Sequence, residues 1–171
     1  MKKVAVFGKP GSGKSTLSKA LSRSIGVELY QLDSIVYQAN GEPIDRETFT
    51  QIHDDILTSD HWIIDGLGPI GAFKKRISNA DTLIYIDLPY PLSYWFVTKR
   101  LLKSLFIKPE GWPDGSSVIK GTIASYKMLK LSPTFWNAEF EQELNTLSST
   151  KTVHIIRTIS DLKAFVHQCS R

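Results

Sequence analysis

The stretch that decides the fold is GKPGSGKS, residues Gly8–Ser15, which directly follows the apolar run VAVF at positions 4–7. Its glycines, lysine and serine match the Walker A pattern in full, and the flanking residues predict a strand before it and a helix after it. Glycines let the backbone curl so that successive N–H groups face phosphates. The start of the following helix adds a partial positive charge. The segment therefore predicts a site for a nucleoside triphosphate.

Individual positions of this loop have expected roles. We expect Lys14 to bridge the outer phosphates and the Ser15 hydroxyl to ligate Mg²⁺. Thr16 is expected near the α-phosphate, and Pro10 is expected to stiffen the loop. A glycine-rich turn without a ligand is the alternative, but such a turn does not need a lysine followed by two hydroxyls. The candidate nucleotide-binding residues are Gly8, Pro10, Gly11, Ser12, Gly13, Lys14, Ser15 and Thr16.

Strand-like and helix-like segments alternate along the rest of the chain, which predicts a parallel sheet with helices on both faces. We expect strands at Val4–Gly8, Val27–Leu32, Trp62–Asp65, Leu83–Asp87 and Val153–Arg157. The expected helices span 14–25, 45–58, 92–105, 117–131 and 133–147, with a last one from 160 or 161. Gly26 is a candidate C-cap and Asp45 a candidate N-cap.

Three aspartates follow predicted strands, and ligands of such sheets bind beyond the carboxyl ends of the strands. We expect Asp65 to hold Mg²⁺ through a water, unless it only caps the next turn, and Gly66 to let a substrate approach the backbone. Asp33 either orients the acceptor and accepts its proton, or caps a helix that begins near Ser34. Asp87 is predicted to have a structural role.

The composition of the chain limits which metal sites, cellular compartments and binding partners are expected. The chain has 171 residues, a net charge of +4 and one cysteine, Cys169, so an intramolecular disulfide and a zinc cluster are both excluded. We expect a cytoplasmic protein, a monomer or homodimer, without a membrane partner, because no run approaches the roughly 20 apolar residues of a membrane span. The positive charge suits either nucleic acid or polyphosphate, and the absence of a long basic arm favours polyphosphate.

The assembled motifs resemble the adenylate-kinase-like branch of P-loop kinases and, more closely, the DNA topology modulation proteins (FlaR-like). The matching pieces are GKPGSGKSTL, LYQLDSIVY, HWIIDG, RISNADTLIYIDLP and VTKRLL, in the family's order over about the first 110 residues. The resemblance implies a three-layer α/β/α P-loop fold with a five-stranded parallel sheet in the order 2-3-1-4-5. It also implies ATP, Mg²⁺ and one domain over 1–171, with an acceptor-side segment at about 33–60 and a short helical lid at about 100–121.

The sequence departs from adenylate kinases after the third strand. Those enzymes carry an arginine just after the Asp-Gly turn, whereas residues 65–69 here read DGLGP. The next cations are Lys74, Lys75 and Arg76. Arg76 precedes ISNAD as the family's arginine does, so it is a candidate substrate-binding residue, while the two lysines equally suit a solvated face.

Arg100 is the candidate that neutralises the charge developing on the transferred phosphoryl group, because its planar fork suits phosphate oxygens. Lys99 and Lys103 either assist it or form a solvated helix face. Trp112, in the predicted loop 106–121, either stacks on a ligand or does not contact one. Trp95 and Trp136 are predicted to pack in the core.

The sequence as a whole predicts Mg²⁺-ATP-dependent phosphoryl transfer to a small acceptor, similar to that of nucleoside monophosphate kinases. Lys14, Asp33 and Arg100 are the candidate catalytic residues, with Ser15 and Asp65 for the metal and Asp33, Gly66 and Arg76 for the acceptor. Two alternatives stay open. One is a nucleotide-dependent binding or switch protein that acts on nucleic acid, and the other is a kinase of a non-nucleotide small molecule.

Overall fold

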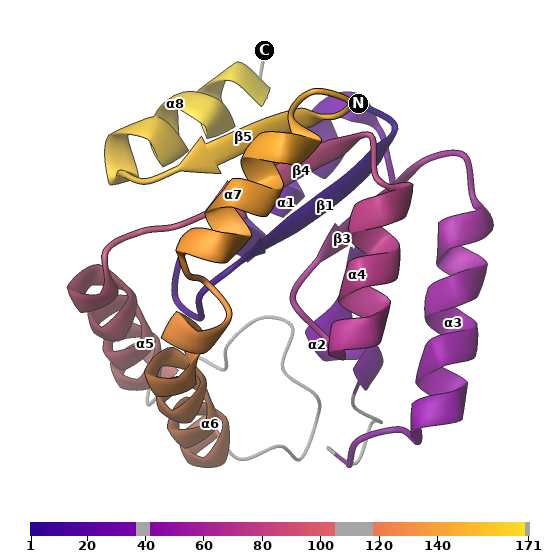
Figure 1. Ribbon diagram of the computed structural model, residues 1–171. Helices are drawn as coiled ribbons and strands as arrows, with labels where there is room; N and C mark the ends of the chain where they lie inside the picture. Colours follow the sequence, from indigo (N-terminus) through magenta and orange to yellow (C-terminus); the bar gives the residue numbers. More distant parts are fainter. Residues whose placement is uncertain (37–41, 105–117, 170–171) are drawn as a thin grey trace.

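A single parallel sheet organises the computed structural model, which describes residues 1–36, 42–104 and 118–169 (Figure 1). The sheet has five strands in the order β2-β3-β1-β4-β5, and every neighbouring pair is parallel. This confirms the strand order implied by the resemblance. The strands are β1 (Lys3–Gly8), β2 (Leu29–Gln31), β3 (Trp62–Asp65), β4 (Thr82–Ile86) and β5 (Thr152–Ile156).

Helices connect the strands much as the sequence pattern predicts. They are α1 (Lys14–Ile25), α2 (Leu32–Val36), α3 (Arg46–Thr58), α4 (Ile70–Asn79), α5 (Tyr90–Ser104), α6 (Val118–Leu131), α7 (Ala138–Leu147) and α8 (Ile159–Cys169), with a short 3-10 turn at Ser132–Thr134. Gly26 ends α1 in the left-handed conformation, and the Asp45 side chain accepts a hydrogen bond from the Thr48 amide at the start of α3. Both predicted caps are confirmed.

Two expected elements differ from the structure. The strand predicted at 27–32 is shorter, because Leu32 already begins the helix α2. The helix predicted at 133–147 is divided, because Asn137 caps α7 with a side-chain oxygen that accepts from the Phe140 amide at 3.0 Å. A local side-chain hydrogen bond of this kind starts a new helix instead of extending the preceding turn.

Side chains of β1 alternate between two apolar cores, as the two-residue period of a strand requires. Val4 and Val6 pack against α1 and α8, whereas Ala5 and Phe7 face the layer formed by α3, α4 and α7 (Figure 1). Trp136 belongs to this second core, stacked at 5.9 Å from Phe7. The three layers place every strand's carboxyl end at the same edge of the sheet.

Helices α5 and α6 extend beyond that edge and pack against each other (Figure 1). The Thr98 and Tyr126 hydroxyls are 2.7 Å apart, and the rings of Tyr94 and Tyr126 stack at 5.8 Å. Trp95 on α5 is exposed, so the prediction that it packs in the core was wrong. Trp112 and most of the predicted lid loop lie outside the described residues. No helix in the described ranges is long and apolar enough to span a membrane.

Candidate active site

The phosphate loop passes so close to its neighbours that two of its glycines are sterically required. Gly8 has φ +144°, and a Cβ there would lie 2.2 Å from the Ile86 carbonyl oxygen at the end of β4. Gly11 has φ +73°, and its Cβ would lie 2.5 Å from the Ser93 carbonyl oxygen of α5. Both conformations are ones that other residues rarely adopt. The loop is therefore held between β4 and α5.

The start of α1 is arranged to receive an anion. Its N-cap, Gly13, has no side chain to accept hydrogen bonds, and no acidic residue lies in the first turn. The first amides of a helix have no partner within the helix, and they carry the positive end of its dipole. Ser15 and Thr16 are exposed in this turn. These residues fit a phosphate group that would occupy the open end of the helix.

Lys14 lies under the loop, where its Nζ donates a hydrogen bond to the Lys9 carbonyl oxygen at 2.8 Å. Burial lowers the pKa of Lys14, while the charges of Asp65 and Asp33 oppose that shift. The ammonium group is thus hydrogen-bonded to one backbone oxygen and experiences the charges of two carboxylates at the carboxyl edge of the sheet.

Asp65, the last residue of β3, is buried with 4% of its surface exposed. Burial raises its pKa, and the nearby Lys14 charge and hydrogen bonding from Ser15 and Gln31 pull the pKa back down. Its Oδ1 atom is buried and has no hydrogen-bond partner among the residues described. A buried, unpaired carboxylate oxygen beside the Ser15 hydroxyl fits a hydrated Mg²⁺ ion, because Mg²⁺ prefers oxygen ligands and keeps several waters.

Asp33 and Arg100 complete the charged cluster. Asp33 lies exposed in the first turn of α2, and its charge acts on Lys14, on Asp65 and on Arg100. Arg100 donates a hydrogen bond from Nη2 to the Ser125 hydroxyl at 2.9 Å, and burial lowers its pKa. The structure thus brings together four side chains that the sequence analysis singled out separately.

Arg76 and Gly66, the two other candidates for acceptor contacts, are both buried at the turn after β3. Arg76 is fully buried, and its Nη2 donates to the carbonyl oxygens of Gly66 at 2.7 Å and Leu67 at 2.9 Å. Burial lowers the pKa of Arg76 to about 10. Gly66 is itself buried, with φ +120°. Nη2 therefore supports the turn after β3, whereas Nε and Nη1 are buried without a hydrogen-bond partner among the residues described.

Lys9 is a residue whose place the sequence analysis missed, because it occupies a variable position of the Walker pattern. It is buried, forms an ion pair with Asp87 and lies 4.3 Å from the centre of the Tyr90 ring. Gly8 pairs with Ile86 across β1 and β4, so Lys9 and Asp87 are the first residues after the ends of two adjacent strands. The structural role predicted for Asp87 matches this contact. The Lys9–Asp87 contact could have been predicted from a strand order that places β1 beside β4.

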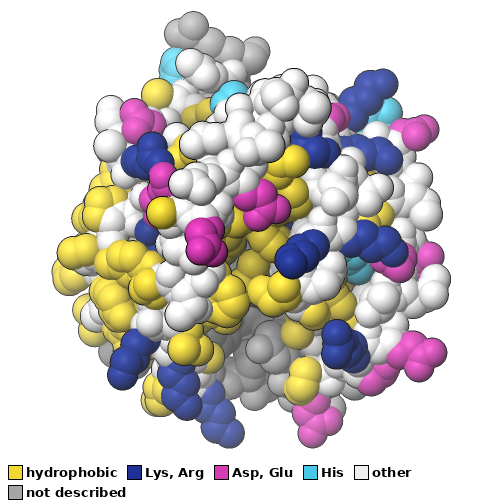
Figure 2. All heavy atoms as spheres, viewed as in Figure 1, with side chains coloured by type: hydrophobic (Ala, Val, Ile, Leu, Met, Phe, Trp, Pro, Cys, Tyr) yellow, Lys and Arg dark blue, Asp and Glu magenta, His cyan; other side chains and the backbone are white. Residues whose placement is uncertain are grey.

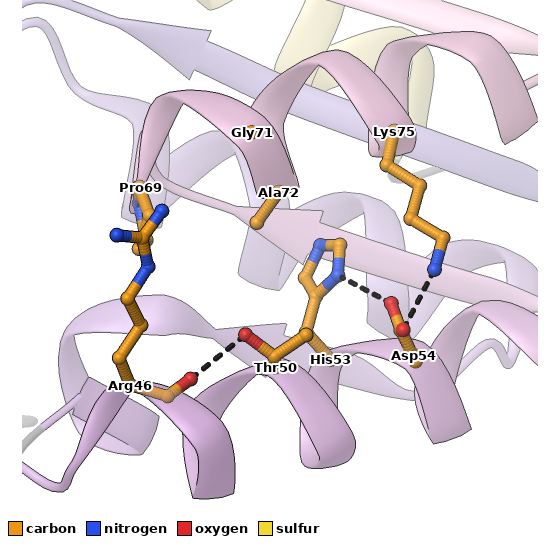
Figure 3. A pocket seen from close by; sticks show the side chains of 8 residues that line it. All are labelled: Arg46, Thr50, His53, Asp54, Pro69, Gly71, Ala72 and Lys75. Carbon is orange, nitrogen blue, oxygen red and sulfur yellow. Dashed lines mark hydrogen bonds and ion pairs between the residues drawn. The ribbon is translucent and has the colours of Figure 1, made fainter.

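A shallow hollow of about 190 Å³ lies between α3 and α4 (Figure 3). In it the Asp54 carboxylate pairs with Lys75 at 2.6 Å and faces His53 Nδ1 at 3.7 Å. Burial of His53 lowers its pKa, which favours the neutral imidazole. The Lys75 side chain is therefore occupied in joining the two helices. Lys99 and Lys103 on α5 are exposed.

Comparison with known proteins gives one consistent fold. No known family profile matches the chain. The chain is similar to shikimate kinases from Mycobacterium ulcerans and Mycobacterium marinum, each 27% identical over 99 residues, or 50% of this chain and 54% of the relative. It thus spans about half the length of the curated relatives that it matches.

Solved structures align over almost the whole chain. A shikimate kinase from Acinetobacter baumannii in complex with shikimate has a TM-score of 0.57 at 14% identity and covers 98% of this chain and 90% of its own. A shikimate kinase from Bacteroides thetaiotaomicron gives 0.52 at 12% identity, covering 96% and 94%. A sugar kinase from Janibacter gives 0.51 at 15% identity, covering 99% and 90%. The chain therefore has the P-loop α/β fold of shikimate kinases.

Proposed function

We propose that the protein is a P-loop phosphotransferase that moves the γ-phosphoryl group of ATP to a hydroxyl group of a small, non-nucleotide molecule. The observation that carries this proposal is the convergence of Lys14, Asp33, Asp65 and Arg100 at the carboxyl edge of the sheet. Two cations and two carboxylates at the open end of α1 provide separate groups for the donor, the metal and the acceptor.

The proposed binding of ATP, the phosphoryl donor, follows from the phosphate loop. The amides at the start of α1 bind phosphate oxygens, and the Lys14 ammonium exchanges its bond to the Lys9 carbonyl for the outer phosphates. Ser15 and, through water, Asp65 would hold Mg²⁺, which neutralises charge on the phosphates when bound.

In the proposed transfer to the acceptor hydroxyl, Asp33 and Arg100 have the main roles. The acceptor oxygen forms a bond to the γ-phosphorus while the bond to the β–γ bridging oxygen breaks and ADP leaves. Asp33 orients the hydroxyl and accepts its proton. Arg100 neutralises the charge on the equatorial oxygens. Asp33 is exposed, which leaves it accessible to a small molecule.

The turn after β3 supports an alcohol over a nucleoside monophosphate as acceptor. Residues 65–69 contain no arginine that could pair with an acceptor phosphate, and Nη2 of Arg76 donates to two backbone carbonyls of this turn. The similarity to shikimate kinases points the same way. A monophosphate acceptor, as in adenylate kinases, and a nucleotide-dependent switch, as the FlaR-like resemblance suggests, are the alternatives that the experiment must separate.

The experiment is a transfer assay with γ-labelled ATP and Mg²⁺ on a panel of shikimate, simple sugars and nucleoside monophosphates. We expect label on a hydroxyl compound, with none on a monophosphate. Asp33→Asn should lower turnover by about 10²-fold or more with ATP affinity retained. Label on a monophosphate would contradict the alcohol acceptor, and nucleotide binding without transfer across a broad panel would contradict the kinase.

A further inference from the structure

Helices α5 and α6 form a pair whose outer face combines large apolar side chains with lysines. Seven of the eleven most exposed large apolar side chains in the described part of the chain belong to these two helices. Among them Trp95 is 56% exposed and Ile119 is 63% exposed. The full set is Tyr94, Trp95, Leu102, Ile119, Ile123, Met128 and Leu131. Tyr94 stacks on Tyr126 between the two helices, and Met128 lies about half a turn round α6 from Ile119. We call the other five residues, with Lys99, Lys103, Lys127 and Lys130, the α5–α6 outer face.

Apolar and basic residues alternate at helical spacing on this face. Trp95, Lys99 and Leu102 follow one another at intervals of four and three residues along α5. On α6 the residues Ile119, Ile123 and Lys127 are each one turn apart. Residues three or four apart share one side of a helix. Figure 2 shows hydrophobic side chains gathered over α5 and α6, with Lys and Arg side chains along the lower margin of the patch.

The charged side chains of α5 and α6 are all positive. Neither α5 nor α6 contains an aspartate or glutamate, although acidic residues are almost as numerous as basic ones in the whole chain, 17 against 21. A partner for this face must therefore be negatively charged and must also accept bulky apolar side chains.

We propose that the α5–α6 outer face binds reversibly to the surface of an anionic lipid bilayer. Interfacial helices insert aromatic and aliphatic side chains among the headgroups while their lysines attract the anionic lipids. A bilayer meets both requirements at once. The chain lacks a membrane-spanning run, which is the basis of the expectation of no membrane partner. An interfacial face needs no such run, so the proposal departs from that expectation.

Two other binding partners, a second copy of the chain and nucleic acid, fit the α5–α6 outer face less well. A second copy of the chain would place lysines opposite lysines, since neither helix has a carboxylate to pair with them. Nucleic acid would satisfy the lysines and could stack on Trp95, but it would leave exposed aliphatic side chains such as Ile119 and Ile123 against phosphate. Of these three partners, the lipid surface is the one that uses both classes of side chain.

The α5–α6 outer face lies close to the charged cluster, so membrane binding would affect the position of the candidate active site. Arg100 lies on α5 and donates to Ser125 of α6, so the face belongs to the same pair of helices as the charged cluster. Binding would therefore hold the open edge of the sheet close to the lipid surface. This inference concerns the helix pair and does not depend on the proposed transfer reaction.

The test is co-sedimentation of the full chain with vesicles of phosphatidylcholine alone or of equal parts phosphatidylcholine and phosphatidylglycerol. We expect the protein to pellet only with the anionic vesicles. The double variant Ile119→Gln/Ile123→Gln and, separately, Lys127→Gln/Lys130→Gln should each bind about tenfold more weakly. Matched controls are Ile25→Gln/Ile52→Gln and Lys74→Gln/Lys163→Gln, whose residues are exposed on other helices, and both should bind like the wild type.

Several results would overturn the proposal. One is no pelleting with anionic vesicles. Another is equal binding by the two α5–α6 variants and the wild type, with circular dichroism showing that all are folded. A third is a dimer in light scattering that Ile119→Gln/Ile123→Gln dissociates, which assigns the face to a second copy. A last one is binding to a single-stranded oligonucleotide that depends on the lysines and not on the isoleucines. Because two independent variants test the face, failure of one to fold leaves the other decisive.

Discussion

Lys9 and Asp87 show how a single residue at a variable position of a motif can hold that motif in place. The Lys9 side chain is 3% exposed and the Asp87 side chain 21% exposed. Asp87→Asn leaves a buried ammonium without a countercharge, so we expect the free energy of unfolding to fall by about 3 kcal/mol. Lys9→Met leaves the partly hydrated Asp87 carboxylate without its partner, so it should lower the free energy of unfolding by less. Chemical denaturation of the two variants measures the difference.

The exposed pair Lys75–Asp54 provides the control for this comparison. Its side chains are 52% and 34% exposed, and surface ion pairs contribute about 1 kcal/mol or less. Lys75→Met should therefore change the free energy of unfolding far less than Asp87→Asn. A larger effect of Lys9→Met than of Asp87→Asn would contradict the view that burial of the ammonium dominates.

At the residue level, the sequence marks the candidate site residues but not the residues that support them. Motif spacing marks the Walker loop, strand ends mark Asp33 and Asp65, and a guanidinium group on a predicted basic helix marks Arg100. Lys9 and the inward turn of Arg76 could not be found this way, since each depends on a contact across the fold. Lys9 meets Asp87 through the pairing of β1 with β4. Arg76 meets carbonyls ten and nine residues earlier.

At the scale of elements, the phosphate loop and α5 are coupled through Gly11. A Cβ there would lie 2.5 Å from the Ser93 carbonyl oxygen and 3.0 Å from Val97 Cγ2. Gly11→Ala must therefore displace either the loop or α5, in addition to straining a left-handed backbone. We expect a loss of about 2 kcal/mol or more in the free energy of unfolding and weaker nucleotide binding. Thermal denaturation and a fluorescence titration with nucleotide measure the two effects.

Gly71 in α4 is the matched control, because a Cβ there meets nothing within 4 Å. Gly71→Ala lies in a helix, so it should raise the free energy of unfolding by up to about 1 kcal/mol and leave nucleotide binding unchanged. If Gly11→Ala behaved like Gly71→Ala, the close packing of the loop against α5 would not exist in solution.

Element boundaries were predictable where a local cap sets them and unpredictable where tertiary contacts do. Gly26 and Asp45 define the end of α1 and the start of α3 from the sequence alone. The shortening of β2 was not visible, because an edge strand ends where its neighbour stops pairing, here at Gln31 opposite Asp65. The exposure of Trp95 was also missed, because helical spacing does not say whether another layer covers a face.

For the whole molecule, alternation of strands and helices predicted a parallel sheet, whereas the order of the strands came from the resemblance alone. The convergence of the charged cluster depends on both facts together. Because β3 lies between β1 and β2, the strand ends that precede the phosphate loop, Asp33 and the turn after Asp65 lie side by side.

A whole-molecule prediction follows from Lys14, which is buried at a cost to its charged form. A ligand that binds only the folded state stabilises it, by about 2.7 kcal/mol at a hundredfold excess over its Kd. For a chain of this size, a non-hydrolysable ATP analogue with Mg²⁺ should therefore raise Tm by roughly 5–10 °C. Lys14→Met takes a countercharge from the buried Asp65, so it should lose the response of Tm to nucleotide whatever its own Tm is. Differential scanning calorimetry, with Lys163→Gln on α8 as control, distinguishes this from general destabilisation. A folded wild type whose Tm does not change with Mg²⁺ and the analogue would remove the donor site, and with it the basis for placing Asp33 and Arg100 around a transferred phosphoryl group.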